Sequence, residues 1–122
     1  MNISIKRAYD PANDADGCRV LVDRLWPRGV SKASAHLESW RKDVAPSPIL
    51  RTWWKHDPDR LDDFETRYRA ELDGTPETVA AVADLRALIE GNAERGVTTT
   101  LIYGAKDPWV NHARILAAYL SE

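Results

Sequence analysis

The sequence predicts a single small α/β domain in which a short, mostly parallel sheet of about three strands packs against about five helices. Two β-branched, apolar runs, residues 19–22 and 97–103, are typical of buried strands. Residues 2–7 alternate apolar and polar, as a half-exposed strand does. At 122 residues the chain has the size of one domain, so we assign residues 1–122 to it.

A polar loop joins the first two predicted strands. Residues 8–17 contain Pro11, Asn13 and Gly17, which are typical of turns. The loop is shorter than the roughly dozen residues of a usual helical crossover, so the direction of the first strand stays open.

Helix starts are indicated by a Ser, Thr or Asp cap followed by proline at the first helical position. Such pairs occur at 47–48, 57–58, 75–76 and 107–108. They predict helices from residue 48, over about 58–73 and 76–94, and from residue 108. We expect Ile49 and Trp109 on the buried faces of the first and last of these. A further helix over about 35–44 is predicted by Leu37, Trp40 and Val44 at i, i+3 and i+7.

Charged and aromatic side chains follow both buried strands. Residues 23–29 carry Asp23, Arg24, Trp26 and Arg28, and a proline and a glycine make this loop stiff. The loop after residue 103 carries Lys106, Asn111 and His112. If the two strands are parallel neighbours, both loops lie at the sheet edge where ligands bind in α/β proteins.

An anion site is the functional interpretation of these loops. Guanidinium groups and helix N-termini favour phosphate or carboxylate, so Arg24, Arg28 and Lys106 would hold the ligand. Asp23 and Asn111 would line the site, and Trp26 would stack on the ligand. The unperturbed pKa of a histidine, about 6.5, suits a general acid or base, which makes His112 and His56 the candidate catalytic residues of an enzyme.

Structural interpretations explain the same residues. Asp23 and Arg24 can form an ion pair that holds the loop, Arg28 and Lys106 can be solvated, and Trp26 can plug the loop against the core. His112 can be a packed, hydrogen-bonded residue. A nucleic-acid or protein interaction module is a further alternative, although the net charge of −2 argues against nucleic acid.

Composition excludes several classes of protein. One cysteine and three scattered histidines argue against a metal site, and no glycine-rich phosphate loop occurs, so we expect no metal and no cofactor. No run approaches the roughly 20 apolar residues of a membrane span, and the N-terminus does not resemble a signal peptide. We therefore expect a cytoplasmic protein whose partner is a small anionic ligand and not a membrane.

Motif strings along nearly the whole chain carry a family resemblance. They include DRLWPRG at 23–29, APS at 45–47, YGAKD at 103–107 and NHA at 111–113. Together they resemble the YeaO-like branch of the domain-of-unknown-function family 488. The resemblance implies a small cytosolic bacterial α/β protein and brings no established activity. Its motif residues add Arg51 and His56 as neighbours of the site, whereas Trp54 and Gly104 fall at variable positions and receive no role.

Overall fold

Four parallel strands form the centre of the computed structural model, which describes residues 2–122. The strands are β1 (Ile3–Arg7), β2 (Cys18–Leu21), β3 (Ser39–Trp40) and β4 (Thr99–Tyr103), in the order β1-β4-β2-β3. Each neighbouring pair is parallel. The three predicted strands are confirmed, and the short edge strand β3 is an addition to them.

Five α-helices accompany the sheet, which agrees with the predicted number but not with every predicted helix. They are α1 (Lys32–Ala35), α2 (Pro48–Trp54), α3 (Leu61–Gly74), α4 (Pro76–Glu94) and α5 (His112–Leu120). Short 3-10 turns occupy Asp14–Asp16, Lys42–Val44 and Pro58–Arg60. Within residues 2–122, none of the helices has both the length and the apolar character needed to cross a bilayer.

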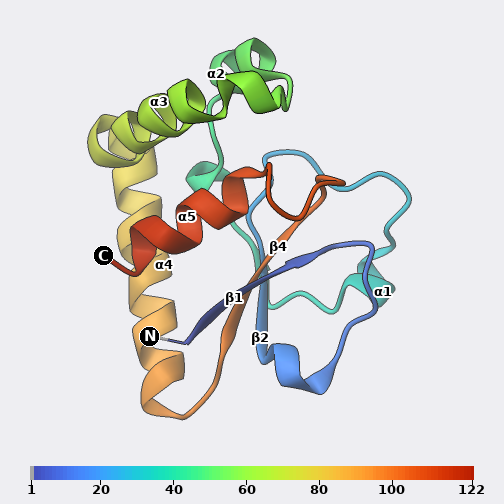
Figure 1. The fold of residues 1–122 in the computed structure, drawn as a ribbon. Helices are drawn as coiled ribbons and strands as arrows, with labels where there is room; N and C mark the ends of the chain where they lie inside the picture. Colours follow the sequence, from blue (N-terminus) through green and yellow to red (C-terminus); the bar gives the residue numbers. More distant parts are fainter. Residues whose placement is uncertain (1) are drawn as a thin grey trace.

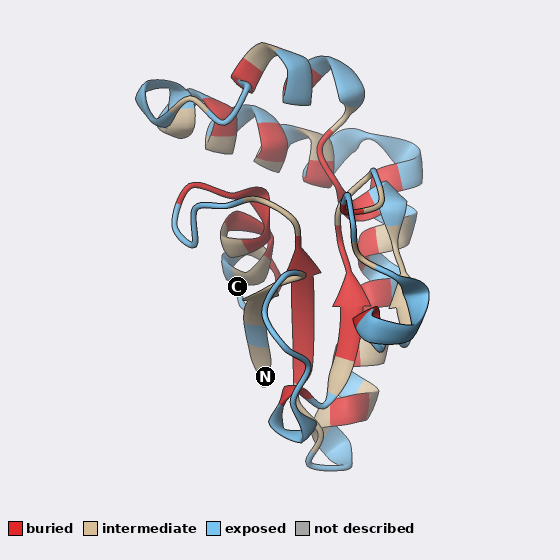
Figure 2. Ribbon diagram, turned by 90° about the vertical axis from the view of Figure 1, so that its right-hand side faces the viewer, coloured by how far each residue is buried: buried red, intermediate tan, exposed pale blue. Residues whose placement is uncertain are grey.

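The two faces of the sheet are covered differently (Figures 1 and 2). Successive strand residues point to opposite faces, so Val20 and Leu101 enter the core beneath α3, α4 and α5. Leu21 and Ile102 face the other side, where α1 and the loop after β2 cover them. The α2–α3 pair overhangs the carboxyl end of the strands, the edge at which the site lies (Figure 1).

An aromatic stack fixes this overhang. Trp54 of α2 stacks on Phe64 of α3 with ring centroids 3.7 Å apart, and Phe64 continues to Tyr68 at 5.7 Å. All three side chains are buried. The Tyr68 hydroxyl donates to the Val44 carbonyl over 2.5 Å, so the stack also holds the chain segment that leads into α2.

The helix predicted over about 35–44 is wrong. The segment instead forms the end of α1, β3 and a 3-10 turn. His36 adopts a left-handed conformation (φ 48°) that ends α1. Trp40 then pairs with Leu21 of β2, and its indole N–H donates to the Asp23 carbonyl over 2.7 Å. These tertiary bonds outweigh the helical spacing of the apolar residues.

The predicted start of the last helix is also wrong. Asp107 caps only a turn, in which its carboxylate accepts the N–H groups of Trp109 and Val110. α5 begins after Asn111, whose side-chain oxygen accepts the N–H of Arg114. Trp109 therefore lies in the preceding loop and is 64% exposed.

The prediction that Ile49 is buried is also wrong, because α2 lies at the end of the molecule. The inner side of this short helix buries Leu50 and Trp54. Ile49 lies on its outer side and is 84% exposed.

Candidate functional site

The two predicted loops meet at the carboxyl edge of the sheet. β2 and β4 are parallel neighbours, so residue 23 and residue 104 follow adjacent strand ends. The Asp23 carboxylate oxygen Oδ2 accepts the Gly104 N–H over 2.8 Å. A Cβ at position 104 would lie only 2.9 Å from that oxygen. Gly104, to which the sequence assigned no role, therefore permits the close contact between the loops.

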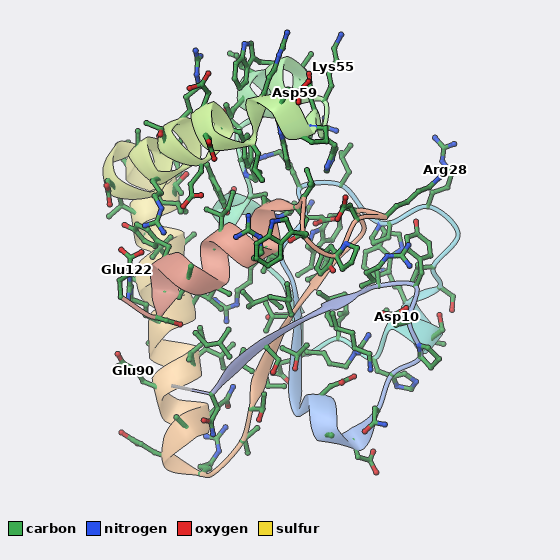
Figure 3. The ribbon with its side chains drawn as sticks, viewed as in Figure 1. Asp10, Arg28, Lys55, Asp59, Glu90 and Glu122 are labelled. Carbon is green, nitrogen blue, oxygen red and sulfur yellow. The ribbon has the colours of Figure 1, made fainter. Side chains whose placement is uncertain are left out.

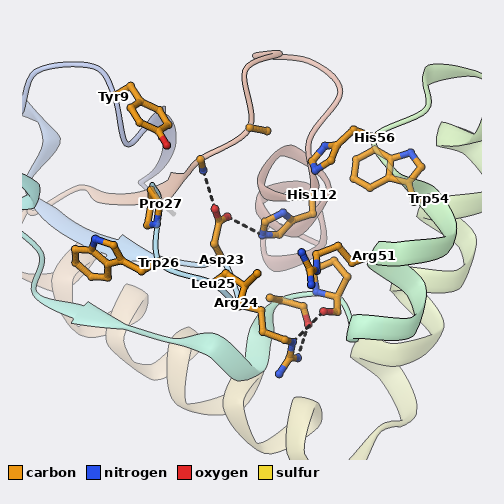
Figure 4. A pocket seen from close by; sticks show the side chains of 14 residues that line it. Tyr9, Asp23, Arg24, Leu25, Trp26, Pro27, Arg51, Trp54, His56 and His112 are labelled. Atoms are coloured by element: carbon orange, nitrogen blue, oxygen red, sulfur yellow. Dashed lines mark hydrogen bonds and ion pairs between the residues drawn. The ribbon is translucent and has the colours of Figure 1, made fainter. Parts of the chain in front are cut away.

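A cavity of about 240 Å³ lies between these loops and the carboxyl end of α2 (Figure 4). Exposed residues form its mouth: Tyr9, Leu25, Arg51 and His56. Buried or half-buried residues form its walls and floor: Asp23, Arg24, Trp26, Pro27, Ala45, Pro46, Trp54, Gly104, Ala105 and His112. Small-molecule sites in proteins usually measure roughly 300–1,000 Å³, so this cavity suits a small ligand.

Asp23 and His112 occupy the inner part of the cavity. His112 is the first residue of α5, and its Nε2 lies 2.9 Å from the Val22 carbonyl oxygen. A carbonyl only accepts, so Nε2 carries the proton and Nδ1 of the neutral ring is an acceptor. Asp23 Oδ1 lies 3.5 Å from the same Nε2. This oxygen is buried and has no hydrogen-bond partner among the described residues.

The surroundings of this pair shift both pKa values toward the neutral forms. Burial raises the pKa of Asp23 above its ordinary 3.8, although the charges of His112, His56 and Arg51 and the Gly104 N–H oppose the shift. Burial lowers the pKa of His112 below its ordinary 6.5, despite the opposing charge of Asp23. His112 is therefore neutral at pH 7.

The depressed pKa of His112 predicts a pH dependence of stability. Below pH 6.5 the unfolded chain binds more protons than the native one at this residue, so the free energy of unfolding should fall as the pH drops through that value. The raised pKa of Asp23 has the opposite effect at lower pH, where the free energy of unfolding should rise as the pH drops and this carboxyl group binds its proton in the native chain. Urea unfolding between about pH 8 and pH 5.5 measures the contribution of His112.

A variant pair isolates this dependence. H112Q keeps a donor for the Val22 carbonyl and removes the titration, so its stability should vary less with pH in that window. H36N is the control, because His36 is exposed and its left-handed backbone suits asparagine. Equal slopes in wild type and H112Q would contradict the prediction.

Arg24 and Arg51 are the two cations of the lining, and they differ in their contacts. The Arg24 guanidinium donates to the carbonyls of Ala45 and Pro46, each over 3.1 Å. It thereby ties the loop after β2 to the segment before α2, which is a structural contact different from the predicted Asp23 ion pair. The Arg51 guanidinium has no hydrogen bond or ion pair within residues 2–122, and it points toward the cavity (Figure 4).

The local sequence sets the position of Arg51. Ser47 caps α2 by accepting the Leu50 N–H, and Pro48 occupies the first turn, as predicted. The Glu71 carboxylate of α3 accepts both the N–H and the hydroxyl of Ser47, over 2.8 and 2.6 Å. α2 is thus fixed at its start, and Arg51 follows one turn later.

His56 reaches the cavity from an unusual turn. Lys55 and His56 have positive φ values of 52° and 55°, a left-handed conformation that non-glycine residues adopt at a cost. The turn places the His56 ring against Trp54, 4.6 Å between centroids. The side chain lies near His112 at the cavity (Figure 4).

Three predicted ligand-binding residues lie outside the cavity lining. Arg28 is exposed and points into solvent (Figure 3), and Lys106 is exposed in the loop after β4. Asn111 is fully buried, where it caps α5 and donates to the Asp107 carbonyl. Trp26 lines the cavity while its indole N–H donates to the Val30 carbonyl over 2.6 Å, so it also fixes its own loop.

Sequence reasoning missed several lining residues. Tyr9 comes from the loop after β1, where its hydroxyl donates to the Arg28 carbonyl. Trp54 forms a wall from its core position. The apolar spacing of α2 indicated the burial of Trp54, whereas nothing local to Tyr9 indicated a site. No group of three His, Cys, Asp or Glu side chains in the described part of the chain is placed to hold a metal ion.

Fold and site together define a small single-domain α/β protein with a pocket of mixed polar and apolar lining at the carboxyl ends of parallel strands. A family model described as "Inactive DUF488-N3 subclade" matches residues 2–122, so the chain belongs to this subclade of the domain-of-unknown-function family 488. The resemblance seen in the motifs is thereby confirmed.

Uncharacterised bacterial proteins are similar over nearly the full chain. YeaO of Escherichia coli K12 is 39% identical over 120 residues, which cover 98% of this chain and 97% of YeaO. Rv3073c of Mycobacterium tuberculosis H37Rv is 40% identical over 119 residues, covering 98% and 93%. No solved structure gives a significant match.

Proposed function

We propose that this protein binds a small anionic ligand, carrying a carboxylate or a phosphate, in the strand-end pocket. The observation that supports this most directly is Arg51, whose guanidinium faces the cavity and has no partner within residues 2–122. A guanidinium group is built to bind carboxylate or phosphate through two parallel N–H bonds. Arg24 is the second cation of the same lining, but its guanidinium is bonded to two carbonyls and lies 3.9 Å from the Asp43 carboxylate, so Arg51 is the main anion-binding group of the proposal.

The proposed role is binding without chemistry. The description of the subclade as inactive supports this choice. His112, with its proton on Nε2, offers the ligand an acceptor at Nδ1, and His56 offers a ring at the mouth. Both histidines, the candidate catalytic residues of the sequence, receive binding roles in this proposal.

Arg51 gives the test that separates binding from folding. R51Q removes the charge of an exposed side chain that has no hydrogen bond or ion pair within residues 2–122, so the fold should be unchanged. A charged hydrogen bond contributes about 1.5–3 kcal/mol, so anion affinity should fall about 10- to 150-fold. R28Q is the matched control, because Arg28 is exposed outside the cavity, and its affinity should equal that of wild type.

A thermal-shift screen supplies the ligand for this comparison. The panel contains acetate, benzoate, inorganic phosphate, pyrophosphate and glucose 6-phosphate. An anion at 100 times its Kd should stabilise the wild type by about 2.7 kcal/mol, which is on the order of several degrees in Tm. The proposal fails if no anion raises the Tm, or if R28Q loses binding and R51Q keeps it.

A further inference from the structure

The pocket has two unlike sides (Figure 4). Tyr9 and Pro27 lie on the side of the loops after β1 and β2, where they present ring and aliphatic surface, and in this view Leu25 lies between them and Arg51. Arg51 and His56 lie opposite, on the side of α2. A ligand that fills the cavity therefore meets the guanidinium of Arg51 on the side of α2, and ring and aliphatic surface on the side of Tyr9 and Pro27.

The charge of the lining is small. With the histidines counted as neutral, the charged side chains are the carboxylate of Asp23 and the guanidinium groups of Arg24 and Arg51. The Arg24 guanidinium lies 3.9 Å from the Asp43 carboxylate, which is outside the lining, so within residues 2–122 Arg51 is the lining cation without a protein partner. A monoanion balances the charge of this one guanidinium group, whereas the dianionic form of phosphate would leave a negative charge in a partly desolvated site, which is unfavourable.

Leu25 adds an independent observation. It lines the cavity and is 58% exposed, although it stands in a loop of charged and aromatic residues. Its neighbours Arg24 and Trp26 are both held by hydrogen bonds to backbone carbonyls. The loop therefore holds a leucine side chain at the mouth of the pocket, where an apolar ligand group would cover it.

From these features we infer that the ligand is a monocarboxylic acid with an apolar body of about one aromatic ring. This inference rests on the proposed anion-binding function. The carboxylate lies against Arg51, on the side of α2. The apolar body lies against Leu25 and Pro27. The cavity of about 240 Å³ has room for a ligand of this size.

Isothermal titration with three probes tests the ligand class. Benzoate should bind at least about tenfold more tightly than acetate, because its ring buries apolar area that acetate lacks. Benzoate should also bind more tightly than inorganic phosphate. The R51Q variant should weaken both carboxylates, since it removes their shared contact.

Two substitutions of branched aliphatic residues locate the apolar side. L25S should lower the ratio of benzoate to acetate affinity about fivefold, because it removes apolar contact with the ring. I49S is the matched control, since Ile49 is 84% exposed and lies outside the lining, and its ratio should equal that of wild type.

The outcomes separate this inference from the proposed function. If phosphate binds as tightly as benzoate and L25S leaves the ratio unchanged, the pocket binds anions and the inferred ligand class is wrong. If no anion binds in a way that the R51Q substitution weakens, both the inferred ligand class and the proposed anion-binding function are wrong.

Discussion

Replacing Trp54 with alanine should lower the free energy of unfolding by about 3–5 kcal/mol, the usual cost of removing a large aromatic side chain from a core. Trp54 is 1% exposed and stacks on Phe64 with centroids 3.7 Å apart. Its indole N–H donates to the Asp57 carbonyl over 3.0 Å. The substitution therefore leaves a cavity between α2 and α3. It also removes one of the two hydrogen bonds to the Asp57 carbonyl, which still accepts the Arg60 N–H.

Urea unfolding of W54A, W54F and W53A measures this effect. W54F keeps a ring against Phe64 and should lose less stability than W54A. Trp53 is half-buried and lies beneath the guanidinium groups of Arg60 and Arg67, so W53A should cost less as well. If W53A costs as much as W54A, the aromatic stack is not the main link between α2 and α3.

The same substitution connects the core to the pocket. Trp54 is at once the base of the aromatic stack and a wall of the cavity, and it contacts the His56 ring. We expect W54A to weaken anion binding even at temperatures where it remains folded, because the α2 end that presents Arg51 loses its support. The pocket thus depends on packing that α2 shares with the core.

Much of the fold could be predicted because local signals and tertiary contacts agree. The β-branched run 97–103 contains β4, and the Ser47-Pro48 pair starts α2 as its cap chemistry requires. The helix prediction for residues 35–44 failed because apolar spacing alone does not decide between a helix and an edge strand. Trp40 is placed by pairing with β2 and by a bond to the Asp23 carbonyl, both distant in sequence.

The position of the candidate site could be predicted from the sequence, whereas the residues that line it could be predicted only in part. Asp23 and Gly104 meet because parallel strands end at one edge, which the strand pattern predicted conditionally. Which side chains face inward depends on the loop itself. Pro27 is buried and Arg28, next to it, is exposed, so proximity in sequence did not bring Arg28 into the cavity. Arg51 comes from α2, and only the family resemblance pointed to it.

Gly17→Ala should lower the free energy of unfolding by about 2–6 kcal/mol, a second large loss that arises from the backbone. Gly17 has φ 65° and ψ −124°, a combination nearly confined to glycine, and such strain costs roughly 1–3 kcal/mol. A Cβ there would also lie 2.3 Å from the Thr98 carbonyl oxygen, which accepts the Cys18 N–H at the start of the β2–β4 pairing. Overpacking of this kind adds about 1–3 kcal/mol.

Two glycine controls separate strain from collision in the same unfolding experiment. Gly96 has φ 72° and open space where the methyl group of an alanine would lie, so G96A should show the strain alone, about 1–2 kcal/mol. Gly91 lies inside α4 with open space around it, so G91A should stabilise by about 0.5–1 kcal/mol. If G17A costs no more than G96A, the contact with Thr98 yields easily. If G17A costs clearly more than G96A, the close contact of Gly17 with Thr98 holds β2 and β4 in register at their start. The Asp23–Gly104 contact at the other end of the two strands follows from that register.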